Sequence, residues 1–435
     1  MKTHAIIPVF IPHEGCPHDC VFCNQKKITA REKAPDEAET TELIEKHLAQ
    51  LRRNPNITEI EIAFYGGSFT GIPLKDQAMY LALAKKYKDS GQIRQIHLST
   101  RPDYIDDEIL DQLQYYGTDI VELGVQSFDE EVLRLSGRGH SREVIYQSAR
   151  MIKERGMTLG IQLMVGLPGD SYEKCMKSVE ETIKIGPAIA RIYPTVVLKE
   201  TALYEMYLQN RYEPLKEEDA VNTVKDMMRS LKSAGIDIIR VGLKSSDNIT
   251  MNGGAVAAGS YHPAFRQLAE SALAREEIEA LLLGELRSAA VRLSADAASC
   301  IAGIFGRNRR AGKACRERRD GRDGKDCKAG RDVRSGRGGE SCGDLAGLRT
   351  AVRDQGREKQ CGTVERFAGF RTTLRDQGGQ RRLKVTFYSA PESFSNLVGL
   401  KRANKSYFFE KYPELNLKFA VDRTLQRNKY RVSVE

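Results

Sequence analysis

The 435-residue chain carries 68 Lys and Arg against 59 Asp and Glu, a formal net charge of +9 that favours an anionic partner such as RNA. Its nine cysteines, an odd number, exclude a fully paired disulfide framework and favour a reducing compartment, so we expect a cytoplasmic protein. No apolar run reaches the roughly 18 residues of a membrane-spanning helix. Pro8 and Pro12 interrupt the apolar start of the chain, which argues against a signal peptide.

Short apolar runs alternate with segments of helical periodicity along the N-terminal half. The predicted strands are His4–Phe10, Ile60–Tyr65, Ile96–Ser99, Asp119–Val125, Leu159–Val165 and Ala190–Leu198. The predicted helices are Glu37–Arg53, Lys75–Asp89, Ile105–Tyr116, Arg142–Gly156 and Lys174–Ile185. This alternation predicts an α/β fold, a parallel sheet with helices outside it, and six such units predict a partial (β/α)6 TIM-like barrel. One further helix and strand are expected over Glu218–Ala234 and Asp237–Leu243.

Three cysteines lie between the first predicted strand and the first helix, as Cys16, Cys20 and Cys23, at the spacing C-x3-C-x2-C. Intervals this short force a tight loop in which the three sulfurs can converge. Three thiolates can hold an iron–sulfur cube and leave its fourth iron open to a small molecule, whereas ferredoxin sites close that position with a fourth cysteine. The next cysteine is Cys175, so the spacing favours a catalytic 4Fe–4S cluster. A zinc site, with His18 inside the loop, is the alternative.

Glycines and polar residues stand within or at the ends of several predicted strands, where parallel α/β folds place their active sites. Gly66 and Gly67 end one strand and would let a ligand approach the backbone closely. Glu122 and Gln126 lie an even number of residues apart and therefore share one face of their strand. Such side chains are costly to bury inside a barrel unless they bind something, and Gln162 is a similar candidate.

Four further residues are weaker candidates. Arg138 could pair with a ligand carboxylate, and His140 follows it closely; for both, a helix-capping or surface role is an equal alternative. Lys199 and Tyr204 come just after the sixth predicted strand and are expected at the rim of the barrel or facing a substrate.

The composition changes from about Ser299. Residues 306–340 contain 13 Lys and Arg against 6 Asp and Glu, with many glycines, so this segment cannot bury enough surface to offset its chain entropy. Near-copies at 347–356 and 369–378 indicate a duplicated low-complexity insert. From Leu383 onward two predicted strands flank a helical segment around Gly399. That segment is vaguely similar to a KH RNA-binding module, although Arg402 replaces the second glycine of its GXXG loop.

We accordingly expect four regions along the chain. Residues 1–270 form the partial barrel, 271–298 a helical extension, 299–382 a disordered Arg/Gly-rich segment, and 383–435 a small α+β region.

The cysteine motif, with Phe22 before its third cysteine, resembles the signature of the radical S-adenosylmethionine (SAM) superfamily. The resemblance implies that the three cysteines ligate a 4Fe–4S cluster whose open iron binds SAM. One electron, from a donor such as flavodoxin or ferredoxin, then splits SAM into methionine and a 5′-deoxyadenosyl radical. It also implies that the glycine pair contacts the SAM amino group, although Ser68 replaces a typical Glu there. The residues expected to position SAM are Gly66, Gly67, Glu122, Gln126, Arg138 and Gln162.

Four motifs narrow the resemblance: STRPDY at 99–104, ELGVQS at 122–127, RGH at 138–140 and IYPTVVLKETALY at 192–204. In this order they are similar to the catalytic subunit of Elongator, a family implicated in modifying the wobble uridine of tRNA with a radical domain and an acetyltransferase domain. The resemblance covers roughly residues 5–270, and no acetyltransferase-like glycine-rich loop follows. We therefore expect a radical SAM enzyme that acts on RNA, in particular a tRNA base.

Two alternatives stay open. The motifs GVQS and GLPG also resemble radical enzymes of anaerobic porphyrin synthesis, so a small porphyrinogen-like substrate is one alternative. The other is a metal-stabilised RNA-binding protein without catalytic turnover.

Overall fold

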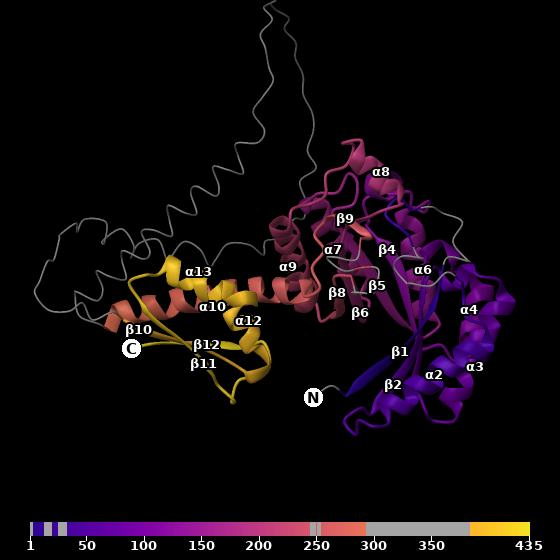
Figure 1. Cartoon of the computed structure of the whole chain (residues 1–435), viewed down its shortest axis with the longest axis horizontal. Coiled ribbons are helices and arrows are strands. Elements are labelled where there is room, and N and C mark those ends of the chain that lie inside the picture. The colour runs from indigo at the N-terminus through magenta and orange to yellow at the C-terminus, as the bar shows by residue number, and fades with distance from the viewer. Residues whose placement is uncertain (1–2, 13–19, 25–32, 244–248, 250–253, 293–382) are drawn as a thin grey trace, which may run out of the picture. The chain divides into compact units, whose positions relative to one another are not determined.

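A computed structural model describes residues 3–12, 20–24, 33–243, 249, 254–292 and 383–435 (Figure 1). Cys16, the basic segment 306–340 and the two near-copies lie outside the described residues. The chain divides into two compact units. The first comprises Met1–Glu277 and Glu392–Asn404, and the second comprises Ile278–Pro391 and Lys405–Glu435.

A seven-stranded parallel sheet forms the centre of the first unit, with the strand order β1-β2-β3-β4-β5-β6-β8. Among the described strands, β1 and β8 each have a neighbour on one side only, so the barrel is open. The strands are β1 (His4–Ile11), β2 (Glu59–Gly66), β3 (Gln95–Thr100), β4 (Ile120–Gln126), β5 (Thr158–Val165), β6 (Ile189–Pro194) and β8 (Asp237–Val241). The predicted partial barrel is confirmed, and β8 is the further strand expected near residue 240.

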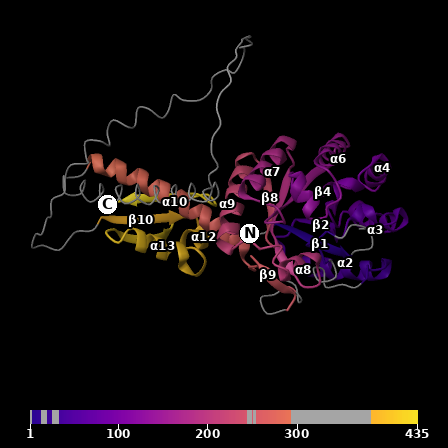
Figure 2. The same ribbon diagram turned by 90° about the horizontal axis from the view of Figure 1, so that it is seen from above.

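The helices cover the outer face of this sheet (Figure 2). Every second strand residue, such as Ile62, Leu98 and Ile161, points outward into one apolar core with the helices, as the alternation of strand side chains requires. The helices before α10 (Phe265–Arg292) are α2 (Glu37–Leu51), α3 (Leu74–Asp89), α4 (Asp107–Tyr115), α5 (Glu130–Leu135), α6 (Arg142–Glu154), α7 (Tyr172–Ile185), α8 (Ala202–Leu208) and α9 (Glu217–Ser233), of which α8 lies beside β7 (Val196–Leu198) and not on the outer face. The intervening strand residues point to the inner face, and many of these are polar.

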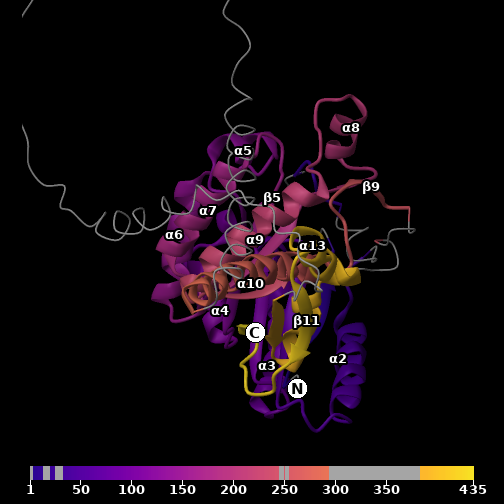
Figure 3. The ribbon, with the colours of Figure 1, turned by 90° about the vertical axis from the view of Figure 1, so that its left-hand side faces the viewer.

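The sixth predicted strand, Ala190–Leu198, is in fact two strands. Pro194 has no backbone N–H to continue the parallel ladder, and the chain leaves the sheet there. Its continuation β7 (Val196–Leu198) pairs antiparallel with β9 (Val256–Gly259) in a separate two-stranded sheet. Figure 3 shows β9 beside α8, so this small sheet and α8 follow the C-terminal end of β6.

The second unit contains a three-stranded sheet of order β11-β10-β12, formed by β11 (Asn416–Val421), β10 (Lys384–Ser389) and β12 (Tyr430–Val434). Phe387 on β10 packs its ring against Phe408 and Phe419, with centroids 4.9 and 5.0 Å apart. The helices of the C-terminal segment are α12 (Phe394–Val398), within the first unit, and α13 (Ala403–Lys411), which spans the boundary. The predicted strands near residues 385 and 418 are confirmed, whereas β12 was not predicted.

The long helix α10 (Phe265–Arg292) begins in the first unit and continues into the second. In the second unit its Glu279 accepts a hydrogen bond from the Tyr407 hydroxyl at 2.8 Å and pairs with Lys411 Nζ at 2.6 Å. Within the described residues, no helix is long and apolar enough to cross a membrane.

Candidate functional site

The described part of the cysteine segment is a tight turn beside the C-terminal ends of the strands. The backbone N–H of Cys23 donates to the carbonyl of Cys20 at 2.9 Å. The Val21 N–H donates to Ser136 O at 3.1 Å, and Val21 O accepts from Leu203 N–H at 2.7 Å. The turn is therefore held between the end of α5 and the start of α8, and Cys20 is buried.

Two guanidinium groups reach the sulfur of Cys20. Arg138 Nη1 lies 3.2 Å and Arg101 Nη1 lies 3.6 Å from Cys20 Sγ. Both arginines are almost completely buried, with 5% and 3% of their surfaces exposed. Arg101 follows β3 directly, and Arg138 stands in the loop between α5 and α6. Two buried guanidinium groups therefore converge on one sulfur atom, where their N–H groups can donate to a metal-bound cysteine.

Arg138 and Gln126, both predicted from the sequence, lie together here. Gln126 ends β4 with φ +68°, an uncommon conformation for a residue other than glycine. Gln126 Oε1 and Arg138 Nε are buried and have no hydrogen-bond partner among the described residues. A Cβ added at Gly124 would lie 3.1 Å from Gln126 Nε2, so this glycine leaves room for both side chains. Buried polar atoms without a partner point to a ligand that would satisfy them.

The predicted glycine pair stands at the end of β2, next to the end of β1. Gly66 has φ +122°, and a Cβ there would lie 2.2 Å from the carbonyl oxygen of Ile11. Gly67 N–H donates to the same carbonyl at 2.9 Å. Only glycine allows this close approach. Ser68 is buried and its side chain makes no cap for the short helix that follows.

Glu122 lies further back along β4, about 13 Å before Gln126 at the usual rise per strand residue. It is fully buried. Its Oε1 is 2.6 Å from His97 Nε2, and its Oε2 accepts from Arg191 Nε at 2.6 Å. Gln162 Nε2 also reaches Oε2, at 3.4 Å. The structure thus gives Glu122 protein partners, and the expected contact of Glu122 and Gln162 with SAM stays a prediction.

These groups belong to a longer ionic network on the inner face, which we call the inner-face network: Glu61, Tyr65, His97, Glu122 and Arg191. His97 Nδ1 lies 3.3 Å from Glu61 Oε1, and Arg191 Nη2 donates to the Tyr65 hydroxyl at 2.7 Å. Burial alone would lower the pKa of His97, but Glu122 and Glu61 raise it above its ordinary value. Burial alone would raise the pKa of Glu122, but His97 and Arg191 lower it.

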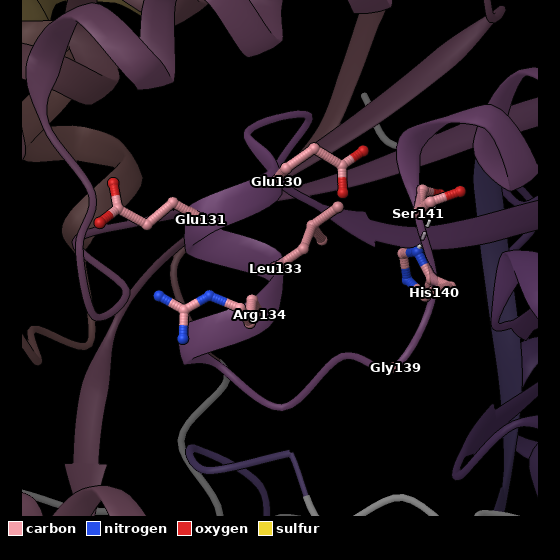
Figure 4. A pocket seen from close by; sticks show the side chains of 7 residues that line it. All are labelled: Glu130, Glu131, Leu133, Arg134, Gly139, His140 and Ser141. Carbon is pink, nitrogen blue, oxygen red and sulfur yellow. Dashed lines mark hydrogen bonds between the residues drawn. The ribbon is translucent and has the colours of Figure 1, made fainter.

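The weaker candidates have different surroundings. Lys199 is exposed and its N–H donates to Ala255 O, while Tyr204 lies on α8 beside the cysteine turn. His140 borders a groove of about 710 Å³ (Figure 4) that is lined by Glu130, Glu131, Leu133, Arg134, Gly139, His140 and Ser141. Burial and the nearby Arg138 lower the pKa of His140 to about 4. Among the described residues that line this groove there is no cysteine and none of those expected to position SAM.

Sequence reasoning missed Arg101, His97, Glu61 and Arg191. A polar residue at an inward position of an otherwise apolar strand was the available signal, and it was used for Glu122 and Gln162 but not for His97 or Glu61. Among the described residues, no three His, Cys, Asp or Glu side chains are arranged to hold a metal. Because Cys16 lies outside that part of the chain, the predicted three-cysteine site stays a prediction.

Comparison with known families agrees with this geometry. Residues 10–182 match the model of the Radical SAM superfamily, and residues 187–275 match the Radical SAM C-terminal domain. The chain belongs to the radical SAM superfamily. The resemblance that the sequence motifs indicated, to this superfamily and to the Elongator catalytic subunit, is confirmed by its relatives.

Three curated relatives show which members are similar. A tRNA uridine(34) acetyltransferase from Methanocaldococcus jannaschii is 29% identical over an alignment of 259 residues, which covers 51% of this chain and 48% of the relative. An uncharacterized protein of the same organism is 30% identical over 230 residues, 50% of this chain and 69% of that protein. Elongator complex protein 3 of Schizosaccharomyces pombe is 25% identical over 252 residues, 48% and 46% of the two chains. The chain thus spans about half the length of the first and third of these relatives.

A solved structure supports the fold. An N-terminally truncated Elp3 from Methanocaldococcus infernus superposes with a TM-score of 0.52 at 24% identity, covering 64% of each chain.

Proposed function

We propose that this protein is a radical SAM enzyme that reductively cleaves SAM at a 4Fe–4S cluster and uses the resulting 5′-deoxyadenosyl radical to modify a tRNA base. The observation that carries the proposal is the convergence at Cys20. A buried cysteine, two buried arginines and a glutamine oxygen that has no hydrogen-bond partner among the described residues meet at the C-terminal ends of parallel strands, in a chain of the radical SAM superfamily.

The residues present fit the cofactors that the family implies. Cys20 and Cys23, with Cys16, would hold the cluster, and soft thiolate ligands suit iron–sulfur clusters. The unpartnered Gln126 Oε1 and Arg138 Nε would meet polar groups of SAM, whose carboxylate is a natural partner for a guanidinium. The glycine pair is half-buried at the end of β2, where the missing side chains would let a ligand approach the backbone closely. When bound, the cluster supplies the electron that cleaves SAM, and the protein orients both.

A tRNA substrate is supported by two observations. Similar proteins are named as tRNA uridine(34) acetyltransferases, and the chain has a net charge of +9, which suits a polyanion. The one-electron donor would be a small carrier such as flavodoxin or ferredoxin.

The test is anaerobic reconstitution with iron and sulfide, followed by addition of dithionite and SAM. We expect about four irons per chain and formation of 5′-deoxyadenosine, with both lost in Cys20→Ala. Stoichiometric zinc without 5′-deoxyadenosine would instead support a metal-stabilised binding protein. Mass spectrometry of tRNA nucleosides from a deletion strain then tests the substrate. If SAM is cleaved but every tRNA nucleoside is unchanged, a small-molecule substrate is favoured.

A further inference from the structure

Arg101 makes a set of contacts that no SAM-binding role explains. Its Nε and Nη2 donate to the two carboxylate oxygens of Asp103, at 2.9 and 2.8 Å. Nη2 also donates to the backbone carbonyl of Arg138, and Nη1 reaches Cys20 Sγ at 3.6 Å. The planar guanidinium therefore connects the end of β3, the Arg138 loop and the cysteine turn in one fixed geometry.

The surroundings of Arg101 keep it in this position. Only 3% of its surface is exposed, and its guanidinium also lies 5.7 Å from the ring centre of Tyr104. Burial alone would raise the pKa of Asp103, but Arg101 holds it below its usual value. Asp103 is thus ionised at neutral pH and offsets part of the Arg101 charge. A forked pair of hydrogen bonds fixes the direction of the remaining N–H groups, one of which points at the sulfur.

This arrangement has an electrostatic consequence for any iron–sulfur cluster on Cys20. Reduction adds one negative charge to the cluster, and a nearby positive charge stabilises the reduced state more than the oxidised state. Hydrogen bonds to the cysteine sulfurs, net charge and solvent exposure are the factors that set cluster potentials. Arg101 contributes both a contact with a cysteine sulfur and a positive charge. Because Arg101 is buried, solvent ions screen this charge only weakly.

We propose that Arg101 is a positioning residue that holds the Cys20 sulfur and the Arg138 loop together and raises the reduction potential of the cluster, with Asp103 setting the size of the effect. This inference rests on the proposed 4Fe–4S cluster. It assigns a role to the Arg and Asp of the STRPDY motif, neither of which is expected to touch SAM.

The experiment measures the midpoint potential of the reconstituted full-length protein by redox titration followed by electron paramagnetic resonance, without SAM. In Arg101→Gln we expect the ratio of reduced to oxidised cluster at a fixed potential to fall about tenfold, which is about 59 mV for one electron. In Asp103→Asn, which keeps the guanidinium and removes its counter-charge, the shift should have the opposite sign. Arg101→Lys should give a smaller fall than Arg101→Gln, because the charge stays but the fork is lost.

Arg155→Gln is the matched control. Arg155 is likewise ion-paired, with Asp107 and Asp111 where Arg101 has Asp103, so this variant removes the same charge from an arginine that does not contact the cysteine turn. It lies at the far end of α6, about 20 Å along the helix from the Arg138 loop. Its midpoint potential should equal that of the unmodified protein, because this distance exceeds the Debye length.

Each outcome decides between the two proposals. An unmodified protein that binds no iron would overturn the proposed function, and this inference with it. Full iron content with the same potential in Arg101→Gln as in Arg155→Gln would overturn the inference alone. If Arg101→Gln binds no iron, Asp103→Asn decides: a more positive potential supports the role, and an unchanged potential rejects it.

Discussion

At the scale of single residues, His97 is the most informative side chain of the inner face. It is almost fully buried between two carboxylates, those of Glu61 and Glu122. We expect His97→Gln to lower the free energy of unfolding by about 3 kcal/mol, because removing one partner of a buried ion pair leaves an uncompensated charge. The matched control is His47→Gln on α2, where the imidazole Nδ1 lies 2.9 Å from the backbone carbonyl oxygen of Leu43.

The pH dependence of this loss follows from the two shifted pKa values. The raised pKa of His97 gives stability that is complete below its ordinary pKa of 6.5 and is lost as pH rises through the folded value. The lowered pKa of Glu122 gives stability that is complete above its ordinary pKa of 4.5 and is lost as pH falls. The free energy of unfolding, measured by urea titration, should therefore differ most between the native protein and His97→Gln at pH values between 4.5 and 6.5. A difference that grows steadily from pH 6.5 to 9 would contradict the assigned ion pair.

Gly66 gives a second prediction, based on space rather than charge. Its added Cβ would lie 2.2 Å from Ile11 O, and its φ is +122°. We expect Gly66→Ala to cost about 3 kcal/mol, the sum of backbone strain and steric overlap. Gly91→Ala is the control, because φ there is +70° with nothing within 4 Å of the added Cβ, so about 1 kcal/mol should be lost. If thermal unfolding shows that the two variants lose the same free energy of unfolding, the Ile11 carbonyl does not overlap with a side chain at position 66.

At the scale of elements, the start of α8 supports the cysteine turn. The Thr201 side chain caps this helix by accepting from Tyr204 N–H, and the preceding N–H, that of Leu203, donates to Val21 O. Thr201→Ala should cost about 1 kcal/mol of helix-cap free energy and speed the loss of iron to a chelator several-fold. Ser171→Ala, which removes the cap of α7 away from the turn, should cost a similar free energy without changing the chelation rate. Equal chelation rates in the two variants would mean that α8 does not stabilise the turn.

Helices and strands long enough to show a periodic pattern were predictable from the sequence. Short elements, and strands that depend on pairing with a distant strand, were not. The helices over 142–154 and 172–185 and the strands around residues 62, 123 and 162 lie where periodicity placed them. The six-residue α5 is too short to show helical periodicity, and β9 and β12 exist because a partner strand stabilises them. The break between β6 and β7 was signalled by Pro194, a signal that the sequence reasoning did not use.

The candidate site shows the same limit. The cysteines were predicted from their spacing, Gln126 from its inward position on a strand and Arg138 from its ability to pair with a carboxylate, and the structure places Arg138 and Cys20 in contact. Arg101 was not singled out, because only the folded loop shows that it reaches a residue 81 positions away. Glu122 was singled out correctly as an inward acid, but sequence could not reveal that His97 and Arg191 neutralise it.

At the scale of the whole molecule, the net charge of +9 predicts how an RNA complex responds to salt. Binding that releases counterions from phosphates weakens with ionic strength. We expect the affinity of the full chain for tRNA to fall at least tenfold between 50 and 200 mM salt in filter-binding measurements. A salt-independent affinity would mean that contacts with the bases, rather than with the phosphate backbone, dominate the complex.

The space around Glu122 has a consequence for how this sequence can change. A Cβ at Gly160 on β5 would lie 2.7 Å from Glu122 Cγ, so the glutamate occupies the volume that a side chain on the next strand would need. Positions 122 and 160 should therefore evolve as a pair. Lineages in which 160 acquires a methyl group or more should carry a shorter residue at 122, and lineages that keep the glutamate should keep the glycine.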